Sequence, residues 1–97
     1  MIHAAVAILA GQLVVTVASI PDVDVSPTCR SAARITPERM QSCMKDEQNA
    51  REQLEKGWSR YSVSDTTNCV ATAKLGTFSY VELLTCLEMA TSARAKP

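Results

Sequence analysis

Four cysteines are the residues of this sequence whose type and spacing could do chemistry: Cys29, Cys43, Cys69 and Cys86. Cysteine thiolates can bind zinc, attack a substrate or form disulfides. Zinc sites usually present close cysteine pairs, whereas successive cysteines here lie far apart in the sequence. Nothing in the sequence marks one thiol as activated. We therefore predict two disulfides, for which three pairings are possible.

Few other residues offer catalytic chemistry. The only histidine is His3, and the three glycines are isolated rather than grouped in a phosphate-binding loop. Nucleophilic triads and histidine metal sites would need a histidine in the folded protein. We expect no catalytic residue, no cofactor and no metal, and therefore a protein that binds rather than an enzyme. Ten acidic side chains balance ten basic ones, which gives no electrostatic footprint for nucleic acid.

Two aromatic side chains, Trp58 and Tyr61, flank the end of a predicted long helix. Packing in the core is one interpretation. Tryptophan and tyrosine are also frequent anchors of protein interfaces, so a partner-binding patch is the other. The partner we expect is another exported or envelope protein.

Residues 1–19 predict an export signal. They contain no charged side chain, and most of them are hydrophobic. The apolar run at residues 4–17 resembles the central part of a signal peptide, and small residues follow it, so we expect cleavage after Ala18 or Ser19. The usual positive charge before the run is missing, so the signal is a weak one or the true start lies upstream. An uncleaved membrane anchor and a buried N-terminal helix of a cytosolic protein are the alternatives. An even number of cysteines fits the same periplasmic or extracellular location.

The elements that would position these residues are helices. Residues 20–28 hold two prolines and two aspartates, which predicts an extended entry segment. A short helix or turn is expected within 29–35. A long helix is expected over 37–58, because Thr36 can cap it and Pro37 suits its first position. Its apolar stripe consists of Met40, Cys43, Met44, Ala50, Leu54 and Trp58.

Charged residues lie beside that stripe. We expect Glu47 to pair with Arg51, and Glu52 with Lys56, on a solvated face of the helix. The alternative is that Glu47 points into a ligand site.

Two further helices are expected after the long one. The first covers 65–75, with Ser62 or Ser64 as its cap and Gly76 ending it in a left-handed conformation. The second begins at the Ser79-to-Glu82 capping box. Phe78 and Leu83 are spaced as a hydrophobic staple around that cap. Residues 92–97 are expected to form a flexible tail.

Turn positions favour one cysteine pairing. Antiparallel helices bring residues equidistant from their turn to the same level. The midpoint of Cys69 and Cys86 is 77.5, inside the turn at 76–79, and the midpoint of Cys29 and Cys43 is 36, at the helix break. Pairing Cys43 with Cys69 would leave them about 18 Å out of register at 1.5 Å per residue, beyond the roughly 7 Å that a disulfide tolerates. An early break of the long helix at Gly57 would permit that nested pairing.

Two stretches carry a resemblance to a known group. Residues 79–89, Ser-Tyr-Val-Glu-Leu-Leu-Thr-Cys-Leu-Glu-Met, and the run from Cys-Met-Lys-Asp-Glu at 43–47 to Trp58 are similar to short predicted-exported proteins of alphaproteobacteria. The resemblance covers most of residues 29–90 and transfers no functional residue. It implies bacterial export and a four-cysteine helical domain without an assigned activity.

The sequence as a whole predicts an all-α chain. We expect a small disulfide-stapled three-helix arrangement of helical hairpins at 29–91, following the signal peptide. The predicted function is an exported protein-interaction module. The alternatives are a structural or stress-related envelope protein without a specific ligand, and a membrane-anchored accessory protein that retains residues 1–19.

Overall fold

The computed structural model describes residues 19–31 and 36–95, and within these ranges the chain is helical. Its elements are α2 (Ser26–Ser31), α3 (Pro37–Gly57), the 3-10 turn η1 (Trp58–Arg60), α4 (Val63–Ala73) and α5 (Tyr80–Ala95). The two described ranges contain no strand, so the predicted all-helical, disulfide-bonded fold class is confirmed. The predicted signal peptide lies outside the described residues, apart from Ser19.

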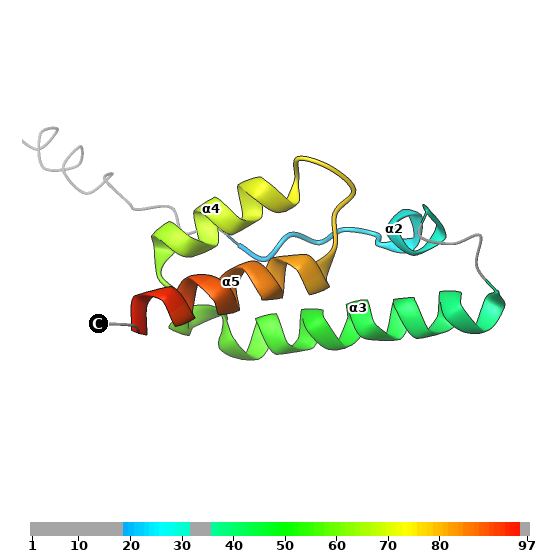
Figure 1. Cartoon of the computed structure of the whole chain (residues 1–97), viewed down its shortest axis with the longest axis horizontal. Coiled ribbons are helices and arrows are strands. Elements are labelled where there is room, and N and C mark those ends of the chain that lie inside the picture. Colours follow the sequence, from blue (N-terminus) through cyan, green and yellow to red (C-terminus); the bar gives the residue numbers. More distant parts are fainter. Residues whose placement is uncertain (1–18, 32–35, 96–97) are drawn as a thin grey trace, which may run out of the picture.

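The long helices are arranged around α5 (Figure 1). α5 packs against α3 on one side and against α4 on the other. α3 continues past the start of α5, and the short α2 lies beside this projecting part. In this view the chain that leads into α2 runs between α4 and α5. The molecule therefore has a packed bundle at one end and a thinner end built from α2 and α3.

Leucines form the centre of the bundle. Leu54 of α3 and both Leu83 and Leu87 of α5 are fully buried. Burying one leucine side chain contributes about 1.5–3 kcal/mol, so each of these residues stabilises the bundle substantially. The other buried members of this core cluster are Val25, Ala50, Cys69, Val70, Phe78 and Tyr80.

α3 follows its sequence signals closely. The Thr36 hydroxyl accepts a hydrogen bond from the backbone N–H of Arg39 (3.2 Å), and Pro37 occupies the first helical position. The helix ends at Gly57 and passes directly into η1. The predicted range 37–58 is confirmed to within one residue.

The prediction that residues 20–28 form an extended entry segment is correct only for its first part. The extended part ends at Val25, which is buried in the core cluster, and α2 begins at Ser26. The Asp24 carboxylate accepts hydrogen bonds from the Ser26 N–H (3.0 Å) and hydroxyl (2.7 Å), which satisfies an amide that the helix leaves unpaired. Both hydrogen bonds lower the pKa of Asp24 below its usual value, and the bond from the Ser26 hydroxyl has the larger effect. The folded domain therefore begins before residue 29, because Val25 belongs to its core.

The start of α4 lies two residues before the predicted 65. Ser62 is its cap, and the Ser62 hydroxyl accepts a hydrogen bond from the Asp65 N–H (3.1 Å).

The predicted left-handed Gly76 is wrong. Among the described residues none has a positive φ. The helix instead ends in a tight right-handed turn, in which the Leu75 N–H donates to the Thr72 carbonyl (3.1 Å). A Cβ atom at position 76 would meet no atom within 4 Å apart from its chain neighbours.

The predicted tail at 92–97 is also wrong for its first four residues. α5 continues through Ala95. Arg94 is held by Asp65 on α4, and the alanines of this last turn favour helix. The last two residues of the predicted tail, 96 and 97, lie outside the described part of the chain.

Candidate functional site

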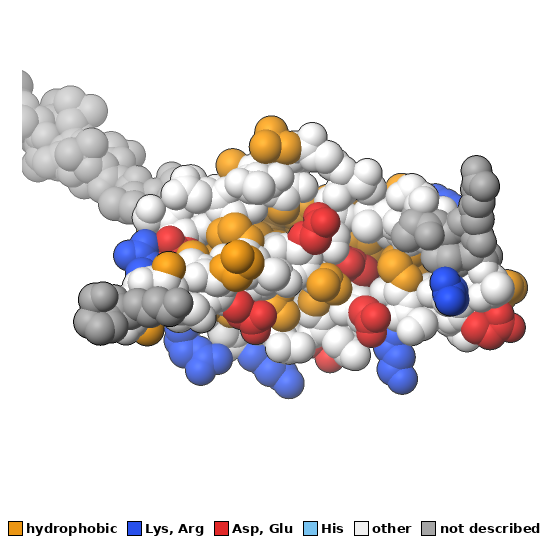
Figure 2. All heavy atoms as spheres, viewed as in Figure 1, with side chains coloured by type: hydrophobic (Ala, Val, Ile, Leu, Met, Phe, Trp, Pro, Cys, Tyr) orange, Lys and Arg blue, Asp and Glu red, His pale blue; other side chains and the backbone are white. Residues whose placement is uncertain are grey.

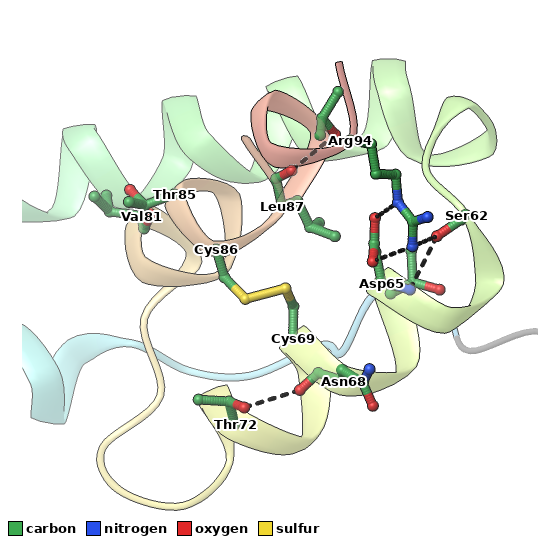
Figure 3. Close-up of a disulfide and its surroundings, with 12 residues drawn as sticks. Ser62, Asp65, Asn68, Cys69, Thr72, Val81, Thr85, Cys86, Leu87 and Arg94 are labelled. Atoms are coloured by element: carbon green, nitrogen blue, oxygen red, sulfur yellow. Dashed lines mark hydrogen bonds and ion pairs between the residues drawn. A yellow bond between two sulfur atoms is a disulfide. The ribbon is translucent and has the colours of Figure 1, made fainter. Parts of the chain in front are cut away.

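The two disulfides join the pairs that the turn positions favour. Cys29 is bonded to Cys43, with 5.7 Å between their Cα atoms, and Cys69 is bonded to Cys86 at 5.8 Å. The second bond links α4 to α5 beside Leu87 (Figure 3). All four thiols are thereby used in covalent bonds, and none is a nucleophile or metal ligand in this form.

Trp58 and Tyr61 lie together where η1 leads from α3 toward α4. Their ring centroids are 6.4 Å apart with an interplanar angle of 81°, an edge-to-face contact. Both rings are half-buried and pack against the core cluster. The structure thus brings the two predicted candidates side by side and leaves part of each exposed. Their role in binding a partner stays a prediction.

Glu47 is neither on a solvated helix face nor paired with Arg51, so that prediction is wrong. The residue is only 4% exposed. One carboxylate oxygen accepts from the Tyr80 N–H and the other from the Ser79 hydroxyl, both at 2.6 Å. The Ser79 hydroxyl in turn accepts from the Glu82 N–H (3.2 Å). A buried carboxylate on α3 therefore supplies the negative charge that the start of α5 favours.

The capping box at the start of α5 is therefore only half formed. Ser79 caps as predicted, but the Glu82 carboxylate is exposed and makes no hydrogen bond to the Ser79 amide. Glu47, which is 32 residues away from Ser79 in sequence, contributes the carboxylate of this cap instead. Local spacing could not predict a cap that comes from another helix. This arrangement accounts for both Glu47 oxygens and gives the residue a structural role.

The Tyr80 hydroxyl ties the entry segment to the bundle. It donates to the Pro21 carbonyl (2.6 Å) and accepts from the Val23 N–H (2.9 Å). It also accepts from the Arg51 guanidinium (3.1 Å). Arg51 then bonds the Asp22 carboxylate at 2.8 Å. A single buried tyrosine thus holds three points of the chain together, which the sequence analysis missed.

A small cavity of about 160 Å³ lies between this entry segment and α3. Ligand pockets usually measure roughly 300–1,000 Å³. The charged groups that line the cavity include Glu47 and Arg51, and both already have partners within the chain. We therefore assign these residues to the fold rather than to a ligand site. The other residues that line the cavity are Val23, Asp24, Val25, Met44, Gln48 and Tyr80.

An ion pair fastens the end of α5 to the start of α4 (Figure 3). The Arg94 guanidinium bonds both oxygens of the Asp65 carboxylate at 2.9 and 2.8 Å. The Asp65 side chain is 12% exposed, whereas that of Arg94 is mostly exposed. Hydrogen bonds from Arg94 lower the pKa of Asp65 below its usual value, and the bond to Asp65 raises the pKa of Arg94. This pair is structural, because it orders the last turn of α5.

Apolar residues on the outward side of α5 are accessible candidates for binding, and unlike the more exposed Leu75 in the turn after α4 they lie along one helix. Met89 is 67% exposed and Val81 is 39% exposed. A shallow hollow on the same side is lined by Thr85, Glu88, Met89, Ser92 and Ala93. Figure 3 shows Val81 and Thr85 on the side of α5 away from the disulfide to α4. Sequence periodicity offered a signal for this surface, because at 100° per residue Val81 and Met89 fall on the side of the helix away from Leu83 and Leu87.

The described residues contain neither a group that could hold a metal ion nor a helix long and apolar enough to cross a membrane. No protein-family model matches the chain, and neither a curated protein nor a solved structure shows significant similarity to it. The surfaces described above are therefore the basis for a functional proposal.

Proposed function

We propose that this chain is an exported protein-interaction module that acts by binding rather than by catalysis. The observation that carries the proposal is the exposed apolar surface of α5, where Met89 and Val81 face outward on a helix whose other side is packed. Exposed apolar groups flanked by polar ones are typical of protein contact surfaces. The half-exposed pair Trp58 and Tyr61 offers a second contact area.

Two disulfides support the exported location. Disulfide bonds persist in oxidising compartments such as the periplasm and the extracellular space. The mature chain expected after cleavage behind Ser19 would span only 20–97, and small exported domains commonly rely on such bonds. This proposal agrees with the resemblance to exported alphaproteobacterial proteins.

Mass spectrometry of the secreted or periplasmic protein tests the export proposal. We expect a mature N-terminus at Ser19 or Ile20. A purified exported protein that still begins at Met1 would contradict cleavage and favour the membrane-anchored alternative.

Site-specific photo-crosslinking in the producing cell tests the interaction proposal. A crosslinking amino acid at Met89 or at Tyr61 should capture one protein in stoichiometric amounts. The matched control is Glu52, on the outward side of α3, where no crosslink to that protein is expected. If Met89 and Tyr61 give no more crosslinking than Glu52, the interaction proposal fails and the structural envelope role is favoured.

A further inference from the structure

The outward face of α5 combines apolar groups with carboxylates in a regular pattern. At 100° per residue, Val81, Thr85, Met89 and Ser92 fall in one row along the helix, within about 80° of each other. On the same wheel Glu82 falls on one flank of this row and Glu88 on the other. Both glutamate side chains are exposed. The row and its two flanking carboxylates are here called the α5 face.

The carboxylates of the α5 face have no partner among the described residues. Arg94 is the only basic residue within α5, and it is bonded to Asp65. α4 contains no Lys or Arg, and its one acid is the same Asp65. The α5 face therefore carries two negative charges beside exposed apolar atoms.

The exposed surface of α3 differs from the α5 face. The exposed residues of α3 carry charges of both signs, including Arg39, Lys45, Asp46 and Glu52. Figure 2 shows acidic and hydrophobic side chains intermixed on the middle of the viewed face, while Lys and Arg lie along its lower edge and at its two ends. The uncompensated negative charge thus belongs to a particular surface and is not a property of the whole chain, whose formal net charge is zero.

We propose that the α5 face binds a cationic amphipathic segment of a partner protein, which deepens and rests on the interaction function proposed above. Lysine or arginine side chains of that segment would pair with Glu82 and Glu88, while its apolar side chains would pack on Val81 and Met89. Methionine suits such a contact, because its unbranched side chain adapts to irregular surfaces. The shallow hollow beside Met89 provides a place for one apolar side chain.

Charge decides against other occupants of the α5 face. A second copy docked through the same face would place Glu82 and Glu88 against identical carboxylates. Nucleic acid and anionic lipid surfaces are repelled for the same reason. A cationic apolar segment is the occupant that satisfies both the exposed methionine and the unpaired acids.

A designed peptide tests this proposal on the full-length, disulfide-bonded protein. The probe is a fluorescein-labelled peptide that contains only leucine and lysine, with leucine on one helical face. Its length is about 15 residues, near the lower limit for an isolated helix in water. We expect binding that weakens as salt is added, because exposed ion pairs are screened. A peptide with glutamate in place of each lysine should not bind.

Charge-neutral variants locate the binding surface. The double substitution Glu82→Gln and Glu88→Gln should weaken binding of the lysine peptide on the order of fivefold, since each exposed ion pair contributes little. Met89→Ser should weaken it to a similar extent. The control is Asp46→Asn with Glu52→Gln on α3, which removes the same charge and should leave the affinity unchanged. Equal weakening in the control, or no weakening in the α5 variants, would overturn the proposal.

The outcome separates this inference from the function on which it rests. If crosslinking at Tyr61 captures a partner but the α5 variants bind the lysine peptide like the wild type, the α5 proposal fails and the interaction function stands. If neither Met89 nor Tyr61 crosslinks a partner in the cell, the interaction function fails, and peptide binding would then reflect charge alone and would not support the proposal.

Discussion

The two disulfides hold two ends of the molecule that are otherwise built differently. Cys69 belongs to the core cluster and Cys86 packs against it, so this bond lies in an interface that packing already stabilises. Cys29 is fully buried but lies outside that cluster, and it is the only buried residue of α2. The bundle end is thus packed and bonded, whereas the α2 end depends mainly on its bond.

This difference shows what a covalent link contributes where the core is thin. A helix of six residues is too short to be stable by itself in water. Apart from the disulfide, a hydrogen bond from the Thr28 hydroxyl to the Phe78 carbonyl ties α2 to the bundle. The Cys29–Cys43 bond therefore positions α2, and the Cys69–Cys86 bond reinforces contacts that α4 and α5 make anyway.

The largest expected effect comes from the bundle end. Leu54→Ala should lower the free energy of unfolding by about 2–5 kcal/mol, because it leaves a cavity in the core. Chemical denaturation measures this loss. Met40→Ala, at a half-buried position on the projecting part of α3, is the control and should cost clearly less. Equal losses at the two sites would contradict the distinction between a packed end and a thin end.

Removing each disulfide in turn sharpens the comparison. The bonds span 14 and 17 residues, so chain entropy assigns each about 3 kcal/mol of stabilisation. Cys69→Ala with Cys86→Ala should lower the free energy of unfolding more than Cys29→Ala with Cys43→Ala does, because Cys69 also packs in the core. Denaturation of both variants checks this order, and the reverse order would contradict it.

The buried cap at the start of α5 is the next test. Glu47→Ala should lower the free energy of unfolding by about 1–3 kcal/mol, because the Tyr80 amide and the Ser79 hydroxyl lose their acceptor inside the fold. Gln48→Ala changes an exposed neighbour and should stay within about 0.5 kcal/mol of the wild type. If Glu47→Ala lowers the free energy of unfolding no more than Gln48→Ala does, the buried cap does not stabilise the bundle.

A smaller effect is expected from the ion pair between α4 and α5. The pKa of Asp65 is lower in the folded than in the unfolded chain, so its stabilisation is present above the unfolded pKa of about 3.9. The stabilisation is lost as the pH falls through the lower folded value. Unfolding measured between pH 2 and 6 should therefore show a weaker pH dependence in Asp65→Asn than in the wild type. Asp24 has a lowered pKa as well, so part of the dependence should remain. An unchanged dependence in Asp65→Asn would contradict this role.

The smallest effect concerns the turn between α4 and α5. Gly76→Ala should stabilise the protein by about 0.4–1 kcal/mol, because position 76 has a negative φ and open space for a methyl group. At Gly57 an added Cβ would lie 3.1 Å from the Arg60 guanidinium, so Gly57→Ala should gain less. Thermal unfolding of the two variants compares them, and a destabilised Gly76→Ala would contradict the turn described above.

Sequence patterns predicted the elements with strong local signals and missed those that depend on distant contacts. Thr36, Pro37 and Ser62 act within one turn of the chain, and the helices that they start were predicted closely. The cap that Glu47 supplies and the clasp that Tyr80 forms join residues more than 30 positions apart, for which spacing carries no signal. The same reason explains the error at 92–97, where Arg94 reaches across to α4.

The candidate site was predicted only in part. Trp58 and Tyr61 were recognised by residue type, and the structure does bring them together. The α5 face was not recognised, although the helical spacing of the sequence already places Met89 away from Leu83 and Leu87. Which side of α5 remains open depends on how α3 and α4 pack around it, and that packing is a property of the fold.

Hydrogen exchange of the Cys29→Ala, Cys43→Ala variant tests most directly the claim that α2 is held by its disulfide and the bundle by packing. We expect the amides of α2 to lose their protection. The amides of α4 and α5 should keep the protection they have in the wild type under the same conditions, apart from a uniform decrease due to lower global stability. Retained protection in α2, or a selective loss in α5, would contradict it.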